Sequence, residues 1–165
     1  MDAPAAFDEL AADPDFEGRC VHREVLAERA ATYGTVSAPL HPEVVARLRA
    51  RGMDPLFAHQ VAGIDAMRAG RSVVIATGTA SGKSACYQVP IISSVVEGRR
   101  DTALLVYPTK ALAQDQLRAM RSWLVPGLRA VTYDGDTASD ERTWARKNAN
   151  VVLTNPEMLH MGILP

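Results

Sequence analysis

The stretch from Ser72 to Ser84, with the sequence SVVIATGTASGKS, constrains the fold of this chain more than any other. It opens with three β-branched residues at positions 73–75, a run typical of a buried strand. A loop of small residues follows, then Gly-Lys-Ser and an apolar stretch long enough for a helix. Strand, small-residue loop, Gly-Lys-Ser and helix form the layout of a phosphate-binding loop, which this stretch therefore predicts.

The chemistry of such a loop follows from its backbone and from two side chains. Its N–H groups point inward and form an anion cradle, and the helix behind it adds about half a positive charge. We expect Lys83 to reach the β- and γ-phosphates of ATP and the Ser84 hydroxyl to bind Mg²⁺, which makes these two the predicted catalytic residues. The residues predicted to contact the cofactor in this loop are Thr77, Gly78, Thr79, Ala80, Ser81, Gly82, Lys83 and Ser84.

Two positions depart from the commonest forms of this loop. The strict pattern G-x-x-x-x-G-K-[ST] has Gly where this chain has Thr77, and many helicases have Gly where this chain has Ala80. A positive φ at Ala80 would cost roughly 1–2 kcal/mol, so we expect a negative φ there. The alternative is a Gly/Ser turn that happens to precede a lysine.

Composition excludes several classes of protein. The formal net charge of the 165 residues is −1, so the chain lacks the overall positive charge that is typical of many nucleic-acid-binding proteins. The two cysteines are far apart and have no C-x-x-C partner, which excludes a zinc site and a disulfide framework. The N-terminus lacks the apolar core of a signal peptide, and no apolar run approaches the length of a membrane span. We expect a soluble, cytoplasmic protein of one domain with an N-terminal extension.

Apolar periodicity predicts an alternation of helices and strands. This alternation predicts an α/β fold with a doubly wound parallel sheet over residues 41–165, preceded by an extension over residues 1–40. Ligands bind such sheets at the carboxyl ends of the strands. The expected helices are 23–33, 42–51, 58–69, 82–96 (ended or kinked at Pro90), 109–124, 137–147 and a short one from 156, and the expected strands are 72–76, 102–107, 129–133 and 151–154.

Three further motifs carry a family resemblance. F-A-H-Q at 57–60 resembles the adenine-reading region of superfamily-two helicases, and Y-P-T-K-A-L-A-Q-D-Q at 107–116 is similar to their motif Ia. V-L-T-N-P-E-M-L at 152–159 resembles their later T-x-P-E motif. Their order resembles the first RecA-like domain of a DEAD/DEAH-box helicase. Together with T-G-T-A-S-G-K-S and T-Y-D-G-D-T they resemble the YprA/MrfA-like group, over roughly residues 40–165.

The resemblance implies an ATP-dependent DNA helicase of the repair type that moves 3′ to 5′ on single-stranded or forked DNA and carries a C-terminal zinc region. It implies that Gln60 reads adenine through its amide, although a surface glutamine fits the same pattern. The implied DNA-contacting residues are Pro108, Thr109, Lys110, Gly135, Thr154 and Glu157; helix caps, a solvated lysine and a plain turn remain open as alternatives for them.

One motif of the family is absent from these 165 residues. ATP hydrolysis needs a carboxylate that holds Mg²⁺ and orients water, and no D-E-x-H box occurs here. Asp134 is a weak substitute. The resemblance implies that the box follows Pro165, so we expect the N-terminal part of a longer helicase. A P-loop enzyme acting on a small molecule and a non-catalytic nucleic-acid-binding module with a vestigial loop are the alternatives.

Overall fold

The computed structural model describes residues 3–16, 18–25 and 30–164, and the chain divides into two compact units, Met1–Ala31 and Thr32–Pro165. The smaller unit holds helix α1 (Ala3–Ala11) and a 3₁₀ turn (Pro14–Phe16). Within it the Arg23 guanidinium binds the Asp8 carboxylate at 2.6 Å. The expected helix at 23–33 is wrong where the structure describes it, because residues 23–25 and 30–33 are not helical. Its positions 26–29 lie outside the described residues.

The larger unit begins with a short antiparallel pair, β1 (Tyr33–Gly34) against β2 (Leu56–Phe57). Helices α2 (Pro42–Ala50) and α3 (Ala58–Arg68) confirm two predictions. Pro42 occupies the first turn of α2, where a missing N–H costs nothing, and Gly52 follows the helix with a φ of +65°. The proposed boundary at residue 40 stays a prediction, although the β1–β2 pair already belongs to the larger unit.

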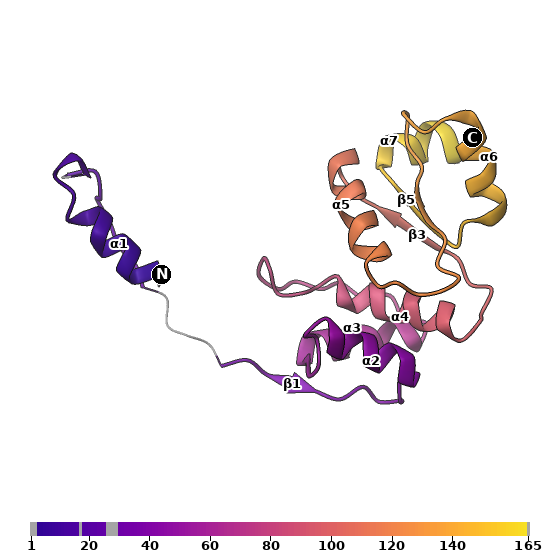
Figure 1. Ribbon diagram of the computed structural model, residues 1–165, viewed down its shortest axis with the longest axis horizontal. Helices are drawn as coiled ribbons and strands as arrows, with labels where there is room; N and C mark the ends of the chain where they lie inside the picture. The colour runs from indigo at the N-terminus through magenta and orange to yellow at the C-terminus, as the bar shows by residue number, and fades with distance from the viewer. Residues whose placement is uncertain (1–2, 17, 26–29, 165) are drawn as a thin grey trace. The chain divides into compact units, whose positions relative to one another are not determined.

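A three-stranded parallel sheet forms the second half of this unit. Its strands are β3 (Ala103–Val106), β4 (Ala130–Thr132) and β5 (Val151–Thr154), in the order β3-β5-β4. Helix α5 (Lys110–Arg121) leads from β3 to β4, and α6 (Ser139–Asn148) leads back to β5. The two crossovers run in opposite directions along the sheet, and Figure 1 shows α5 and α6 on opposite sides of it, as crossovers of the same hand require. The mixed α/β fold with a parallel sheet is therefore confirmed.

Helix α4 (Ala85–Val96) packs closely on α3. A Cβ added at Gly63 of α3 would lie 2.8 Å from the Cβ of Cys86, so only glycine permits this approach. Pro90 does not end the helix, which continues through it for six more residues to Val96. The core beneath these elements is built mainly of apolar side chains, which include Ile64, Val89, Ile92, Leu117, Met120, Trp123, Val151 and Leu153.

The predicted strand at 72–76 is wrong. Residues 71–78 form no secondary structure, and the Val74 side chain is 94% exposed. A strand needs neighbouring backbone groups to satisfy its own N–H and C=O groups, and within residues 30–164 no strand lies beside this segment. Figure 1 shows the chain before α4 as a loop that projects away from the sheet.

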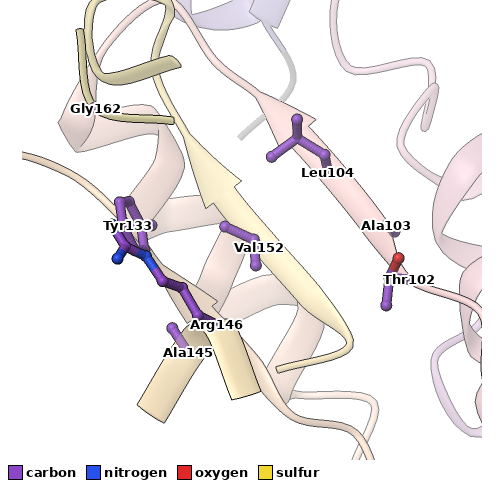
Figure 2. A pocket seen from close by; sticks show the side chains of 8 residues that line it. All are labelled: Thr102, Ala103, Leu104, Tyr133, Ala145, Arg146, Val152 and Gly162. Atoms are coloured by element: carbon purple, nitrogen blue, oxygen red, sulfur yellow. The ribbon is translucent and has the colours of Figure 1, made fainter. Parts of the chain in front are cut away.

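The outer edge of β3 is also without a partner among the described residues, and hollows border it on both faces. One hollow of about 520 Å³ lies between β3 and α6 (Figure 2), and one of about 560 Å³ lies between β3 and α4. Both include Thr102, Ala103 and Leu104. The described chain closes with α7 (Pro156–Met158) and a π-helical turn (Leu159–Ile163). None of its described helices is both long and apolar enough to cross a bilayer.

Candidate nucleotide- and DNA-binding site

The loop between residues 77 and 84 has the backbone of an anion cradle. Two of its residues are left-handed, Ala80 with a φ of +58° and Gly82 with a φ of +71°. Within the described part of the chain, the backbone N–H groups from Thr79 to Ser84 meet no protein acceptor. Successive N–H groups turned by αL residues and left unpaired form the concave donor array that binds phosphate oxygens.

The expectation of a negative φ at Ala80 is wrong. The left-handed conformation costs an alanine roughly 1–2 kcal/mol because its Cβ approaches a backbone oxygen. The loop accepts this strain because the turn at Ala80 sets the direction of the N–H groups that follow. Non-glycine residues in this region concentrate at ligand-binding positions.

Lys83 folds back onto its own loop. Its ammonium donates to the carbonyl oxygen of Thr77 at 2.8 Å and to that of Gly78. The Thr77 and Ser81 hydroxyls bind each other at 2.7 Å and close the loop across its base. Ser84 precedes α4 and its side chain makes no capping hydrogen bond, which leaves the hydroxyl available to a ligand.

Helix α3 braces this loop from behind. The ring nitrogen Nε2 of His59 lies 2.9 Å from the Ser81 carbonyl oxygen and must donate to it, since a carbonyl only accepts. The Gln60 amide donates to the Gly82 carbonyl oxygen at 3.0 Å, while its oxygen accepts from the Phe57 N–H at 2.9 Å. Gln60 is only 4% exposed. In this structure Gln60 thus holds the loop at 77–84, whose phosphate binding stays a prediction, as does the reading of adenine by Gln60.

The donor set for a metal is small. Among the described residues no three His, Cys, Asp or Glu side chains gather as a metal site. The Ser84 hydroxyl fits Mg²⁺, because this ion keeps several waters and takes few protein oxygens alongside phosphate oxygens. Asp134 is only 6% exposed, and its Oδ1 accepts the Asp136 N–H at 2.9 Å within its own turn.

The second part of the candidate site lies at the carboxyl ends of β3, β4 and β5. Pro108, Thr109 and Lys110 are exposed where β3 leads into α5, and the Thr109 hydroxyl caps that helix by accepting from the Leu112 N–H at 3.2 Å. Lys110 binds the Asp136 carboxylate at 2.7 Å, and this bond raises the pKa of the lysine. A Cβ added at the neighbouring Gly135 would stand 3.5 Å from the ammonium.

Two other predicted DNA contacts have unequal access. Glu157 is exposed in the first turn of α7. Thr154 is 1% exposed, and its hydroxyl donates to the Tyr133 carbonyl oxygen at 2.6 Å. Thr154 therefore joins the end of β5 to the end of β4 from inside the protein. The structure brings Lys110 and Gly135 together at the surface, whereas Thr154 is buried and holds the ends of β4 and β5 together.

Sequence reasoning missed several residues of the site. His59 stands inside the quoted F-A-H-Q motif, and its position beside Gln60 was the available signal. Asn155 caps α7 by accepting from the Met158 N–H at 2.8 Å, as an Asn before Pro-Glu indicates. Tyr87 and Tyr107 form a hydrogen-bonded pair that no local pattern predicts, because they are 20 residues apart.

Family models identify the class of protein. The family described as "DEAD/DEAH box helicase" matches residues 57–164, and the chain belongs to this family. It is similar to "ATP-dependent helicase hrq1" of Schizosaccharomyces pombe, with 38% identity across 95% of this chain and 16% of that protein. It is also similar to "Uncharacterized ATP-dependent helicase YprA" of Bacillus subtilis, with 36% identity across 95% of this chain and 21% of the relative.

Solved structures agree with this assignment. The DUF1998 helicase MrfA bound to DNA matches the whole chain with a TM-score of 0.85 and 32% identity, over 23% of its own length. MrfA bound to DNA and AMPPNP matches 96% of the chain with a TM-score of 0.81 and 35% identity, also over 23% of its length. The chain thus spans about a sixth to a quarter of these relatives, and the resemblance to the YprA/MrfA-like group is confirmed.

Proposed function

We propose that this chain is the ATP-binding part of an ATP-dependent DNA helicase that acts in DNA repair and moves 3′ to 5′ on single-stranded or forked DNA. The observation that carries the proposal is the row of unpaired N–H groups from Thr79 to Ser84, with Lys83 beside it. The names of the relatives support ATP as the nucleotide, and the DNA and AMPPNP bound to MrfA support both ligands.

In this proposal the residues divide the work between two ligands. Lys83 would exchange its carbonyl acceptors for the β- and γ-phosphates, and the Ser84 hydroxyl would hold Mg²⁺, which would offset the charge of the phosphates. Bound ATP supplies the phosphoryl group whose transfer to water drives movement along DNA. Gln60 positions the loop and reads the adenine edge, and the proposal places the protein in the cytoplasm.

At the carboxyl edge of the sheet, Thr109 and Lys110 hold one DNA phosphate through the α5 N-terminus and the ammonium. Gly135 lets the backbone come close to that phosphate, and Glu157 positions the same strand. Because Lys110 is already paired with Asp136, DNA binding replaces one anion by another at this lysine. Phosphate contacts of this kind carry no sequence information, as suits a protein that moves along DNA.

The experiment is a calorimetric titration of the full-length gene product with ATP, followed by ATPase assays with and without single-stranded DNA. Lys83→Ala should weaken ATP binding at least tenfold, about 1.4 kcal/mol, and abolish DNA-stimulated turnover. Lys147→Ala, which removes an exposed lysine of α6, is the matched control and should change neither. Unchanged ATP affinity in Lys83→Ala would exclude the phosphate-loop role, and ATPase activity indifferent to DNA would favour a small-molecule enzyme.

A further inference from the structure

A second set of polar side chains joins the phosphate-loop helix to the predicted DNA edge. Tyr87 lies on α4, three residues after Ser84, and Tyr107 follows β3 directly before Pro108. Their hydroxyl oxygens are 3.0 Å apart, and the Tyr87 hydroxyl also donates to Oε1 of Gln116 on α5 at 3.0 Å. The mechanism proposed above uses none of these three side chains.

The hydrogen bonds in this set run in one direction. A tyrosine hydroxyl has a single proton, and Tyr87 gives it to Gln116. Tyr107 must therefore donate to Tyr87, which gives the order Tyr107, Tyr87, Gln116. Burial raises the pKa of Tyr107, and its hydrogen bond with Tyr87 raises it further. Tyr107 accordingly stays protonated and able to donate throughout the physiological pH range.

A second contact fixes α4 against the far end of α5. The indole N–H of Trp123 donates to Oε1 of Gln88 at 3.1 Å, and both residues are at most 4% exposed. Helix α4 therefore meets the β3–α5 unit at two neighbouring positions, a buried one at Gln88 and a half-buried one at Tyr87. The half-buried contact is the one that reaches the loop at 108–110.

We propose that the Tyr107–Tyr87–Gln116 chain positions the loop at 108–110 according to the occupancy of the phosphate loop, so that nucleotide and DNA affinities become coupled. This inference rests on the proposed function. Lys83 must leave the carbonyls of Thr77 and Gly78 to reach a phosphate, which rearranges the loop that enters α4. The first turn of α4 transmits that change, because the Gln88 N–H is bonded to the Ser84 carbonyl oxygen at 2.9 Å.

The test measures a linkage in the full-length gene product. The dissociation constant of a fluorescent single-stranded oligonucleotide is measured without and with saturating AMPPNP. We expect this ratio to depart from one by about 5- to 150-fold in either direction, the usual range of coupling between sites. Tyr87→Phe and Tyr107→Phe each keep the ring and lose only the hydroxyl, and each should bring the ratio to within about twofold of one.

Three controls separate positioning from packing. The affinity of each variant for AMPPNP alone and for the oligonucleotide alone should stay within about threefold of the wild type. The double variant should lose no more coupling than either single variant, because the hydroxyls act as one chain. Tyr33→Phe removes the hydroxyl of a tyrosine in β1 that is 52% exposed and should leave the ratio unchanged.

Two results would overturn the inference while leaving the proposed function in place. One is a wild-type ratio of one with both ligands bound, and the other is an unchanged ratio in both phenylalanine variants. If the phenylalanine variants lose melting temperature and both separate affinities together, the hydroxyls serve packing alone, and the inference is overturned as well. Failure of the wild type to bind either ligand would overturn the proposed function itself, and the coupling with it.

Discussion

The segments at 73–75 and 151–153 carry nearly the same three residues, Val-Val-Ile and Val-Val-Leu. The second forms the first three residues of β5, with Val151 and Leu153 fully buried and parallel neighbours on both sides. The first forms no strand, and its Val74 is 94% exposed. The difference teaches that β-branched composition supplies a preference, whereas a strand requires neighbouring backbone groups to complete it.

The largest expected effect comes from matched truncations in these two segments. Leu153→Ala should lower the free energy of unfolding by about 2–5 kcal/mol, because it opens a cavity in the apolar core that packs against the sheet. Val74→Ala should change it by less than about 0.5 kcal/mol, since its side chain is already in water. Urea unfolding of the 165-residue chain measures both. A large loss in Val74→Ala would show that the segment is packed in solution and would remove the contrast.

A smaller effect is expected at Gln60, which braces the phosphate loop. Gln60→Ala leaves the Phe57 N–H and the Gly82 carbonyl without their side-chain partner and should cost about 1–3 kcal/mol of stability. If Gln60 also reads adenine, the ratio of ATP to GTP affinity should fall in the same variant. Thermal unfolding and competitive nucleotide titration measure the two roles separately.

Gln60→Glu is the matched control for that experiment. It keeps an acceptor for the Phe57 N–H but directs a carboxylate at the Gly82 carbonyl oxygen, so loop bracing should fail even though the side chain keeps its length. Full stability in Gln60→Ala would contradict the bracing role. A wild-type protein without any preference for adenine would contradict the reading role.

The next effect is a gain in stability. Ala80→Gly relieves a left-handed alanine and should stabilise the chain by about 0.5–1 kcal/mol, the strain released less the added freedom of the unfolded chain. Leu124→Gly is the control outside the loop, because Leu124 has a φ of +52° and is 78% exposed. Both should raise the melting temperature, but only Ala80→Gly should alter ATP affinity. A fall in the melting temperature of Ala80→Gly would contradict the strain.

The smallest expected change in stability accompanies a change in association. Among the described residues, the segment at 73–75 and the outer edge of β3 have no strand partner, and they expose Val74, Leu104 and Val106. Exposed apolar edges of this kind favour pairing between chains. Val74→Lys should leave the unfolding free energy within about 0.5 kcal/mol and reduce self-association in light scattering. Threonine at the same position is a neutral control with weaker effect. If the lysine variant associates as the wild type does, the chains associate through a surface other than residues 73–75.

Much of the fold could be predicted from the sequence because it depends on local signals. The periodicity of α5 and the Thr109 cap set that helix within one to three residues of its predicted ends. The strand at 151–154 was predicted to the residue. The strand at 72–76 was not, because its outcome depends on a neighbour rather than on its own residues. The helix expected from residue 137 begins two residues later, at Ser139, since the Thr137 hydroxyl accepts from the Asp134 N–H in a turn.

The candidate site divides in the same way. The motif spacing placed Lys110 at a strand end, as the structure has it, and placed Lys83 and Ser84 where the small-residue loop meets a helix. The expected helix started at residue 82, whereas α4 starts at Ala85, directly after these two residues. It could not show that Thr154 is buried, that Gln60 faces the loop, or that Lys110 is paired with Asp136, because each depends on contacts between distant segments. The sign of φ at Ala80 likewise came from the loop's shape and not from alanine's own preference.

The two carbonyl bonds of Lys83 have a consequence for competition among anions. An empty loop with a free ammonium would attract any small anion, including the inorganic phosphate that surrounds proteins in a cell. Here the ammonium already has acceptors at Thr77 and Gly78, and an incoming anion must replace them. The net binding free energy is therefore only the difference between the new contacts and these two hydrogen bonds. A single phosphate gains little net binding free energy, whereas a triphosphate reaches the lysine and the whole row of N–H groups at once. We expect the lysine to act as an internal competitor that makes the loop selective for long polyphosphates.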